Sequence, residues 1–566
     1  MKNHRLGVLL LISPLLPATA QDVKNGNSAE AFSATLAKTA RVIEPPAGAP
    51  AQTFSTRLKV IRADGLPKEV LGRELDLAFQ APDRLRLQAV VDGQAYSVGR
   101  DGQQLWVHAP ASKFGIIGAP NLPRFATAPE KIDGTKLGRL KLPLSREQLS
   151  LATLLFKVEG RPADMAGGVN CHVLFAPPPP ETAEAFKIPS GQWQLWVRDT
   201  DRLPARIGYT DGKGVHVVVE LQNLKFDEPW AAAKWKLDAG KDDKIETVAL
   251  AHLMRFIPVA LSSFDQNIPT LGPVTGERRV VASHGNGRLE IIDGTKVLFV
   301  KGTPEEMGEQ HGRLLKKEIH DVLNRILYGI GVGSSFTKGR WFFGEIESAQ
   351  SRLNPFIDER YLREMDSLAL AAGLEKEESR LANFFPELFH CSGFALFGDA
   401  TVGGRMFHGR ILDYMKGVGL EQNAVVMVFQ PDKGNAWVNI SYAGFIGSVT
   451  AMNEKHIAIG EMGGRGEGAW DGKPMAQLMR EVMEKANTLD EAVALMRKGP
   501  RTCEYYYVIS DAKSKRAVGI KATPTIFEVV EAGASHPQLP HPVKDTVLMS
   551  AGGRYEKLSE RVQQGF

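Results

Sequence analysis

The chain lacks several features that would place it in a familiar class. It has 3 cysteines in 566 residues, so a disulfide framework does not hold it together. Its formal net charge of +4 is small and its basic residues are scattered, which argues against a nucleic-acid partner. Its His and Cys residues do not fall in metal-ligand spacings. We therefore expect a globular protein that uses no nucleic acid, metal or other cofactor.

No apolar run after the N-terminus is long enough to span a bilayer, and the N-terminal run itself is short. Lys2 and Arg5 form a positive start, residues 6–16 are apolar, and residues 18–20 are small residues typical of a cleavage site. No cysteine follows that site, which argues against a bacterial lipid anchor. We predict a signal peptide over residues 1–20 and a secreted or periplasmic mature protein.

An odd number of cysteines leaves at least one free thiol, which is a chemical liability in an oxidising compartment. We interpret Cys171 and Cys503 as small buried residues. Cys391 is different, because a glycine-rich turn and an Arg-x-x-Asp follow it. That setting indicates a nucleophile.

The first half of the chain is mostly β in pattern after a helix expected at residues 28–44. Polar and apolar residues alternate in short segments between about residues 52 and 230, which predicts an antiparallel sheet that is wet on one face. The clearest segments are residues 56–61, 83–88, 96–99, 104–108, 192–198 and 215–221.

An amphipathic helix is predicted over residues 241–264, with Pro258 kinking it or ending it early. Residues 265–286 begin with a polar stretch rich in Pro and Gly, and we predict that they are a linker. The two domains are therefore expected at residues 21–264 and 287–566.

Residues 82–87, 99–106, 195–199 and 203–207 resemble the periplasmic lipoprotein-carrier superfamily. That resemblance implies an open antiparallel β half-barrel with helices, whose apolar concave face shelters acyl chains. It suggests contact with an acyl chain or lipid through this domain. The alternative is a sheet whose apolar face is simply core.

The second half begins with an expected hairpin around Asp293-Gly294. Thr303 is predicted to cap the next helix, with Pro304 in the first helical position and Glu306 completing a capping box. Helical patterns continue to about residue 383, and strands follow Cys391, interrupted by helices at residues 474–487 and 489–498. Two layers of sheet with helices outside would suit this order, so we predict an α+β protein.

A strand–turn–strand pattern over residues 394–410 predicts a hairpin that returns Arg410 and Asp413 to the neighbourhood of Cys391. A thiol attacks an acyl carbon as the thiolate, and an adjacent guanidinium favours that form by its charge. A free thiol held beside Arg-x-x-Asp therefore predicts acyl chemistry.

The attack also needs a base. His390 and His408 are candidates by residue type, although His408 in a strand also suits a packed core histidine. A cut between His390 and Cys391 would supply a third candidate, the new α-amine of Cys391.

Several motifs in this half resemble the N-terminal nucleophile (Ntn) cysteine hydrolases of the penicillin acyltransferase, choloylglycine hydrolase and acid ceramidase group. They are, in chain order, residues 302–304 and 310–312, Cys391-Ser392, residues 408–410 with Asp413, residues 441–447 and 450–454, and residues 501–503 with 507–511. The resemblance covers about residues 287–564. It implies an αββα sandwich with a pro/α segment at residues 287–390 and a β segment at residues 391–566.

The resemblance also implies roles, because family precursors cleave themselves. The implied roles are cleavage between His390 and Cys391, Cys391 as nucleophile and amine base, Arg410 beside the thiol, Asp413 anchoring the amine, and Asn453 as an oxyanion donor. The family's second oxyanion Asn falls near residues 505–507, where this chain has only tyrosines. The second donor is therefore left unassigned.

The sequence thus predicts an exported, self-processing cysteine amidase that hydrolyses linear amides of acyl-bearing small molecules through a Cys391 thioester. One alternative is acyl transfer to an acceptor other than water. A second alternative is a non-catalytic carrier of acyl chains or lipids.

Overall fold

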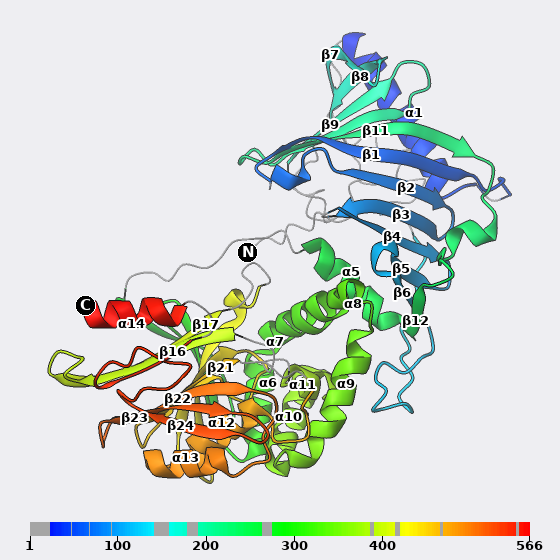
Figure 1. Cartoon of the computed structure of the whole chain (residues 1–566). Coiled ribbons are helices and arrows are strands. Elements are labelled where there is room, and N and C mark those ends of the chain that lie inside the picture. Colours follow the sequence, from blue (N-terminus) through cyan, green and yellow to red (C-terminus); the bar gives the residue numbers. More distant parts are fainter. Residues whose placement is uncertain are drawn as a thin grey trace. The chain divides into compact units, whose positions relative to one another are not determined.

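The computed structural model describes residues 23–46, 48–66, 68–91, 93–140, 158–177, 191–262, 274–384, 390–413, 419–463, 468–550 and 554–565. The expected signal peptide, residues 1–20, lies outside them. Two compact units make up the chain (Figure 1). Unit 1 consists of Met1–Arg124, Pro129–Ser262 and Gly333–Trp341, and unit 2 of Phe125–Ala128, Ser263–Val332 and Phe342–Phe566.

Unit 1 is built on a sheet of 12 strands, in the order β12-β6-β5-β4-β3-β2-β1-β11-β10-β9-β8-β7. The strands are β1 (Thr53–Asp64), β2 (Glu74–Gln80), β3 (Arg84–Val91), β4 (Gln94–Asp101), β5 (Leu105–Ala109), β6 (Phe114–Ala119), β7 (Glu159–Ala166), β8 (Val169–Phe175), β9 (Gln192–Arg198), β10 (Pro204–Thr210), β11 (His216–Asp227) and β12 (Lys244–Ala249). The prediction of a large antiparallel sheet is confirmed for every strand pair except β12 with β6, which is parallel.

The predicted N-terminal helix is α1 (Val23–Ile43). Its apolar face buries Ala31 and Phe32 against Leu174 and Val197 of the sheet, where burial of apolar side chains stabilises the packing. Figure 1 shows α1 beside β7, β8 and β9. The periodic apolar face of this segment is therefore its contact with the sheet.

The predicted helix over residues 241–264 is wrong in its first part. The chain there forms β12, and α5 (Leu250–Ser262) starts only after it. The edge of β6 offers backbone partners to residues 244–249, and this pairing outweighs helical periodicity, because a short apolar segment suits either structure. Pro258 lies inside α5 and does not end it.

Unit 2 contains a sheet of ten strands in the order β13-β14-β15-β18-β19-β20-β21-β22-β23-β24, and a sheet of three in the order β17-β16-β25. The strands are β13 (Arg278–His284), β14 (Gly287–Ile292), β15 (Thr295–Gly302), β16 (His390–Gly398), β17 (Gly404–Asp413), β18 (Ala424–Pro431), β19 (Trp437–Tyr442), β20 (Thr450–Asn453), β21 (Ile457–Gly463), β22 (Tyr505–Asp511), β23 (Arg516–Ala522), β24 (Phe527–Glu531) and β25 (Thr546–Ser550). The α+β class with two large sheets is confirmed.

The helices of the second half are α6 (Pro304–Leu314), α7 (Lys316–Leu323), the π-helix η5 (Asn324–Gly331), α8 (Val332–Lys338), α9 (Phe342–Leu353), α10 (Glu359–Ala372), α11 (Lys376–Ala382), α12 (Met475–Lys485), α13 (Leu489–Arg497) and α14 (Arg554–Gln564). In unit 2, α6, α12 and α13 pack against the ten-stranded sheet, β16 packs on β21 and β22, and α14 packs on β25. The two sheets therefore lie face to face between helices (Figure 1).

The expected linker over residues 265–286 is wrong at its C-terminal end. Residues 278–284 form β13, which pairs with β14 at the edge of the ten-stranded sheet. Val280 and Val281 are both exposed on it, so the strand lacks the one-sided apolar pattern by which strands are recognised.

Local signals at the start of unit 2 are confirmed. Asp293 and Gly294 both have positive φ and join β14 to β15 in a two-residue hairpin turn. Thr303 and Glu306 form the predicted capping box at the start of α6, with Pro304 in the first turn. The helices predicted at residues 474–487 and 489–498 are α12 and α13.

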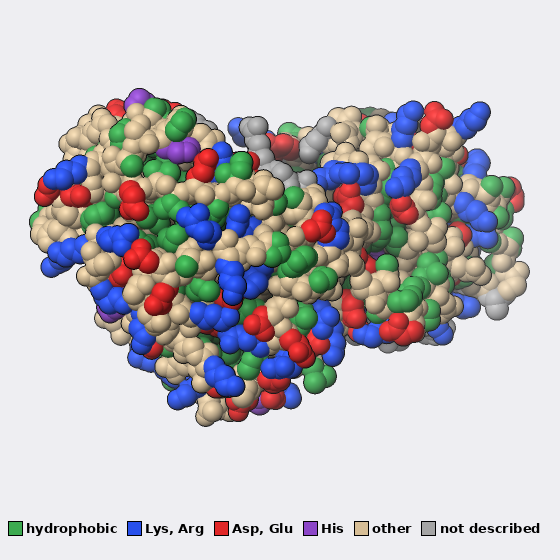
Figure 2. Space-filling model, turned by 60° about the horizontal axis from the view of Figure 1, so that its bottom comes forward, with side chains coloured by type: hydrophobic (Ala, Val, Ile, Leu, Met, Phe, Trp, Pro, Cys, Tyr) green, Lys and Arg blue, Asp and Glu red, His purple; other side chains and the backbone are tan. Residues whose placement is uncertain are grey.

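Basic and acidic side chains are interspersed over the face of the molecule that Figure 2 shows. Among the described residues, no helix combines the length and apolar composition needed to cross a membrane. The described part of the chain also contains no group of three or more His, Cys, Asp or Glu side chains arranged to hold a metal ion.

Candidate active site

The β16–β17 hairpin brings the predicted residues together. Its register pairs Cys391 with Leu412, Gly393 with Arg410, and His390 with Asp413. The Arg410 side chain reaches diagonally to the cysteine, and its Nη2 donates a hydrogen bond to Sγ of Cys391 at 2.8 Å. The predicted meeting of Arg410 with the thiol is therefore confirmed.

Cys391 is fully buried. Burial raises the pKa of its thiol to about 12, which Arg410 and a hydrogen bond from the backbone of Gly463 oppose and the carboxylate of Glu461 reinforces. The Arg410 guanidinium lowers the pKa of the thiol, as the sequence predicted, but the loss of solvation on burial raises that pKa by more. In the uncut chain Cys391 is therefore a protonated thiol.

Glu461 is a partner that the sequence analysis missed. It lies in β21 with a fully buried side chain, and its Oε2 is 3.0 Å from Arg410 Nη2. Its backbone carbonyl accepts a second hydrogen bond, from Arg410 Nε at 3.0 Å. A single acidic residue within an apolar strand was the available signal, because a buried carboxylate needs a charged partner.

Gly460 makes room for this arrangement. A Cβ on Gly460 would lie 3.0 Å from Cγ of Arg410 and 3.3 Å from Nε2 of His408. The arginine therefore crosses β21 at the residue that has no side chain.

Asp413 is paired with Arg554 at the start of α14. Arg554 Nη2 also lies 3.5 Å from the backbone carbonyl of Cys391. Asp413 is thus next to the bond expected to be cut, since its strand partner is His390, but its carboxylate is engaged by a residue to which the sequence assigned no role.

Asn453 is held by its own turn. Its Nδ2 donates to the carbonyls of Met483 at 2.9 Å and Ala486 at 2.8 Å. Its Oδ1 accepts from the backbone of Lys455 and Ile457. These four hydrogen bonds use both amide protons, so the predicted oxyanion donor has none to offer in this structure.

His408 has the environment of a core histidine. Its Nδ1 is 2.8 Å from Oγ of Ser510, and burial lowers its pKa to about 4. The described residues give its buried Nε2 no partner. It is neutral and is not hydrogen-bonded to the thiol, which argues against it as the base.

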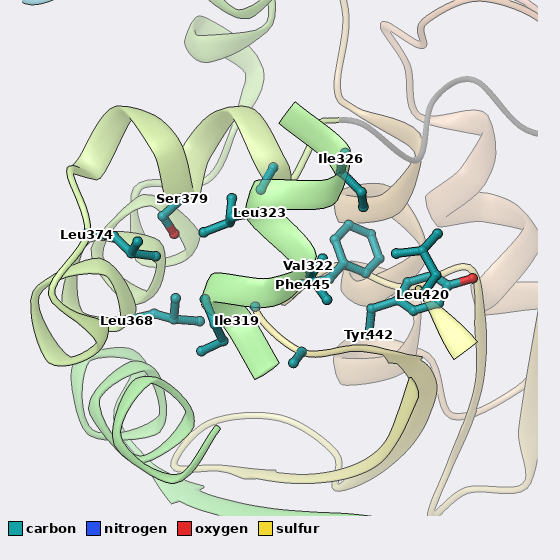
Figure 3. A pocket seen from close by; sticks show the side chains of 13 residues that line it. Ile319, Val322, Leu323, Ile326, Leu368, Leu374, Ser379, Leu420, Tyr442 and Phe445 are labelled. Carbon is teal, nitrogen blue, oxygen red and sulfur yellow. The ribbon is translucent and has the colours of Figure 1, made fainter. Parts of the chain in front are cut away.

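An apolar pocket lies in the same unit (Figure 3). Its walls come from helical segments before Cys391, from Leu420 ahead of β18, and from the end of β19 with the loop that follows it. The lining residues are Ile319, Val322, Leu323, Ile326, Leu368, Leu374, Ser379, Ala382, Leu420, Tyr442, Ala443, Gly444 and Phe445. Its cavity volume is about 30 Å³, so the pocket in this structure is a small, almost wholly apolar void.

Buried polar side chains fix the loop that closes this pocket. Asn383 donates to the carbonyl of Gly444 at 3.1 Å and accepts from the backbone of Ile446 at 2.8 Å. His311 Nε2 accepts from the backbone of Gly444 at 2.9 Å. The loop that follows Tyr442 of β19 and carries Phe445 is therefore held from α6 and from the C-terminal end of α11.

Residues 410–536 match the model of the family described as acyl-coenzyme A:6-aminopenicillanic acid acyl-transferase. The chain carries a penicillin acyltransferase region. The match includes Arg410, Asp413, Asn453 and Glu461, and it begins after Cys391. The assignment of Cys391 as the nucleophile therefore depends on the geometry of the β16–β17 hairpin and not on this match.

Curated relatives support a distant relationship over part of the chain. Protein dcd1B of Dictyostelium discoideum is 23% identical over 299 residues, which are 47% of this chain and 59% of that protein. The N-acylethanolamine-hydrolyzing acid amidase of Mus musculus is 22% identical over 192 residues, 32% of this chain and 52% of the amidase. The chain spans about half the length of the curated relatives it matches.

Solved structures with partial likeness fall into two groups. A Caenorhabditis elegans ortholog of the same amidase is 17% identical, with a TM-score of 0.24 over 30% of this chain and 73% of that one. The Mycobacterium tuberculosis lipoprotein LppX is 14% identical, with a TM-score of 0.22 over 37% of this chain and 99% of that one. TM-scores this low establish no shared fold.

Proposed function

We propose that this chain is the precursor of a cysteine amidase that cleaves itself between His390 and Cys391. It then hydrolyses linear amides that carry an apolar acyl group. The observation that carries the proposal is the contact of Arg410 with the Cys391 thiol, inside a hairpin that leads into the penicillin acyltransferase region. We also propose that the helix–sheet–sheet–helix layers of unit 2 are the Ntn αββα sandwich.

The first step is an acyl shift within the chain. Sγ of Cys391 attacks the carbonyl carbon of His390, the C–N bond breaks, and the proton lost by the thiol is transferred to the leaving nitrogen, which becomes the α-amine of Cys391. Water hydrolyses the resulting thioester, leaving a carboxylate on His390 and a free thiol and α-amine on Cys391. A thiol with a pKa near 12 is ionised in about one molecule in 10⁵ at pH 7, so this step is slow until a base is in place.

The second chemistry is turnover. The new α-amine of Cys391 takes the thiol proton, and the thiolate attacks the carbonyl carbon of the substrate. The α-amine then gives that proton to the substrate nitrogen, which leaves as a free amine. Water then releases the acid from the thioester. Asp413 is next to the new amine by strand register and would hold it as Arg554 gives way.

Acyl transfer is the alternative within the same chemistry, and the name of the matching family favours it. Both reactions share the thioester and differ in whether water or an amine accepts the acyl group. A primary amine added to the assay separates them, because a transferase forms a new amide at the expense of the free acid.

For unit 1 we propose a lipoprotein-carrier-like half-barrel that contacts acyl chains or lipid. Its support is a large antiparallel sheet whose apolar side packs α1. We further propose that residues 1–20 direct export. N-terminal sequencing of the exported protein tests this, and a mature protein that retains residues 1–20 would contradict it.

The function is tested by intact-mass measurement of the purified protein, followed by assays on N-acyl amino acids, bile-acid conjugates, N-acyl lactones and penicillins. We expect two fragments, one starting at Cys391, and release of a free acid from at least one class. Cys391→Ala should give one uncut, inactive chain, whereas Cys503→Ala should be cut and active. An uncut wild-type chain would indicate the carrier alternative.

A further inference from the structure

β17 is an edge strand of unit 2. It pairs with β16 on one side, and within the described part of the chain no strand pairs with its other side (Figure 1). Its ten residues, Gly404–Asp413, therefore leave a row of backbone N–H and C=O groups without a sheet partner there. A long edge of this kind is a template on which a strand of another chain can pair.

The two faces of β17 differ in their surroundings. The side chains of His408 and Arg410 point into unit 2, where both lie against Gly460 of β21. Phe407 and Ile411 alternate with them and point the other way, and their exposed fractions are 53% and 50%. A single exposed apolar residue is ordinary, but two on one face of an edge strand form an apolar strip that a partner could cover.

The outward face of β17 has opposite charges at its two ends. Arg405 and Asp413 are both exposed. Arg405 makes no ion pair with any described residue, and Asp413 is paired with Arg554. Charged side chains on an edge strand commonly prevent its pairing with another sheet. Here, however, the order along the face is cation, apolar, glycine, apolar, anion, so an antiparallel copy of the strand matches it in shape and opposes it in charge.

We propose that β17 is the interface between two copies of this chain, paired antiparallel about Gly409. In that register Arg405 lies opposite Asp413 of the partner subunit, and Phe407 lies opposite Ile411 of the partner subunit. Each contact occurs twice, because the pairing is symmetric. A slip of two residues in either direction would set a charged residue opposite an apolar one, and a parallel pairing would set each charge opposite its own copy.

The pairing uses features of β17 that self-cleavage and amide hydrolysis do not need. The three-stranded sheets of two copies become one sheet of six strands, and cross-strand contacts cover part of Phe407 and Ile411. The carboxylate of Asp413 has two oxygens and can accept from Arg554 and from Arg405 of the partner subunit together. An interface of one strand pair is small, so we expect a weak dimer whose population rises with protein concentration.

Sedimentation velocity of the full-length Cys391→Ala chain at rising concentration tests the interface. This chain lacks the proposed nucleophile, so the result does not depend on the amidase chemistry. We expect a monomer–dimer equilibrium that Phe407→Lys and Ile411→Glu each weaken at least about tenfold. Mixing these two variants should restore dimers, because the new lysine then lies opposite the new glutamate. Leu370→Lys, at an exposed apolar residue of α10, is the control. A parent chain that stays monomeric, or variants that dimerise as well as the control, would overturn the proposal.

A disulfide test checks the register. The Phe407 and Ile411 positions of different copies lie opposite each other in the proposed pairing, at a separation that a disulfide can span. On oxidation, a mixture of Phe407→Cys and Ile411→Cys chains should therefore give a crosslinked dimer, and each variant alone should give at least about tenfold less. In the Cys391→Ala background the other cysteines, Cys171 and Cys503, are both buried. No crosslink in the mixture, or equal crosslinking in the separate variants, would overturn the antiparallel register.

Discussion

The side chains of Arg410 and Arg480 are both buried in unit 2, and their surroundings differ. Arg480 in α12 donates to both oxygens of Glu364 at 2.9 and 2.6 Å, to Glu484 at 2.9 Å and to the carbonyl of Ile446 at 2.9 Å. Its guanidinium also lies 4.7 Å from the ring centre of Tyr361. Arg410 has one carboxylate partner, Glu461, and shares its Nη2 between that partner and a thiol.

The comparison distinguishes an arginine that stabilises the fold, Arg480, from one placed to act on a reacting atom, Arg410. Two carboxylates and a carbonyl occupy the Arg480 donors, so it ties α12 to α10 and to the pocket loop but has no capacity for a reaction. Arg410 instead directs a donor to an atom whose charge changes when it reacts. Burial is the same for both arginines and does not identify their roles. The atoms to which each one donates do identify them.

The largest effect should come from Arg410→Met. Loss of the charge that supports the thiolate should lower both self-cleavage and amide turnover about 10⁴-fold, as seen when a charged group beside a nucleophile is removed. Intact mass and initial rates measure this. The control is Arg410→Met/Glu461→Gln, which leaves no unpaired buried charge and should unfold close to the wild-type denaturant midpoint while being equally inactive. Normal cleavage in that double variant would remove Arg410 from the mechanism.

Arg480→Met should act on stability instead. Removing Arg480 leaves the buried carboxylate of Glu364 without its charged partner, whereas Glu484 keeps its ion pair with Arg360, and we expect a loss of about 3–5 kcal/mol of the free energy of unfolding. Urea unfolding followed by fluorescence measures the loss. The neutral variant Arg480→Met/Glu364→Gln, which leaves the pair of Glu484 with Arg360 in place, should recover most of it and cleave itself at the normal rate. A stable neutral variant that is not cleaved would mean that Arg480 also serves the chemistry.

A third, smaller effect concerns pH near Arg480. Burial, reinforced by the Arg480 charge, lowers the pKa of His311 to about 3 from an ordinary 6.5. Between pH 6.5 and 3 the unfolded chain therefore binds a proton at His311 that the folded chain does not bind. The contribution of His311 to the free energy of unfolding is complete above pH 6.5 and is lost as pH falls towards 3. The slope is at most about 1.4 kcal/mol per pH unit. His311→Asn should flatten the fall in unfolding free energy between pH 6.5 and 4.5, and His284→Asn at an exposed site should not. Equal slopes in all three proteins would contradict this.

The smallest effect should come from Gly460→Ala. The new methyl group would sit 3.0 Å from Arg410 Cγ, so the arginine must move by a few tenths of an ångström. We expect cleavage about tenfold slower, since small misplacements of a reacting group are costly. Stability should be unchanged, because Ala loses less backbone entropy than Gly in a strand. Gly134→Ala, where the methyl group meets nothing within 4 Å, is the control. An unchanged cleavage rate would show that Arg410 tolerates displacement.

Local signals in the sequence predicted much of this arrangement. The strand–turn–strand pattern placed Arg410 at Cys391, and the capping box at Thr303 located the start of α6. Where the prediction was wrong, partners distant in sequence decided the outcome. Residues 244–249 are a strand because β6 has a free edge.

At the candidate site, too, partners distant in sequence decided what the local pattern could not predict. Asn453 sits in a motif whose order suggested an oxyanion donor, but the carbonyls of Met483 and Ala486, some 30 residues further on, hold its amide. The raised pKa of Cys391 follows from burial in the interior of two sheets, which no local pattern reports. Glu461 was within reach of sequence reasoning, since an isolated acid in an apolar strand needs a partner.

The pocket has one further consequence for the processed protein. Of its thirteen lining residues, eight precede the bond between His390 and Cys391 and five follow it. After the cut proposed above, the pocket is an interface between two separate polypeptides, and an occupant would touch both. A small apolar ligand that filled this void would then bind only the assembled pair and would raise the temperature at which the two polypeptides dissociate. The cut would thereby turn an interior void of one chain into a site that reports whether two chains are assembled.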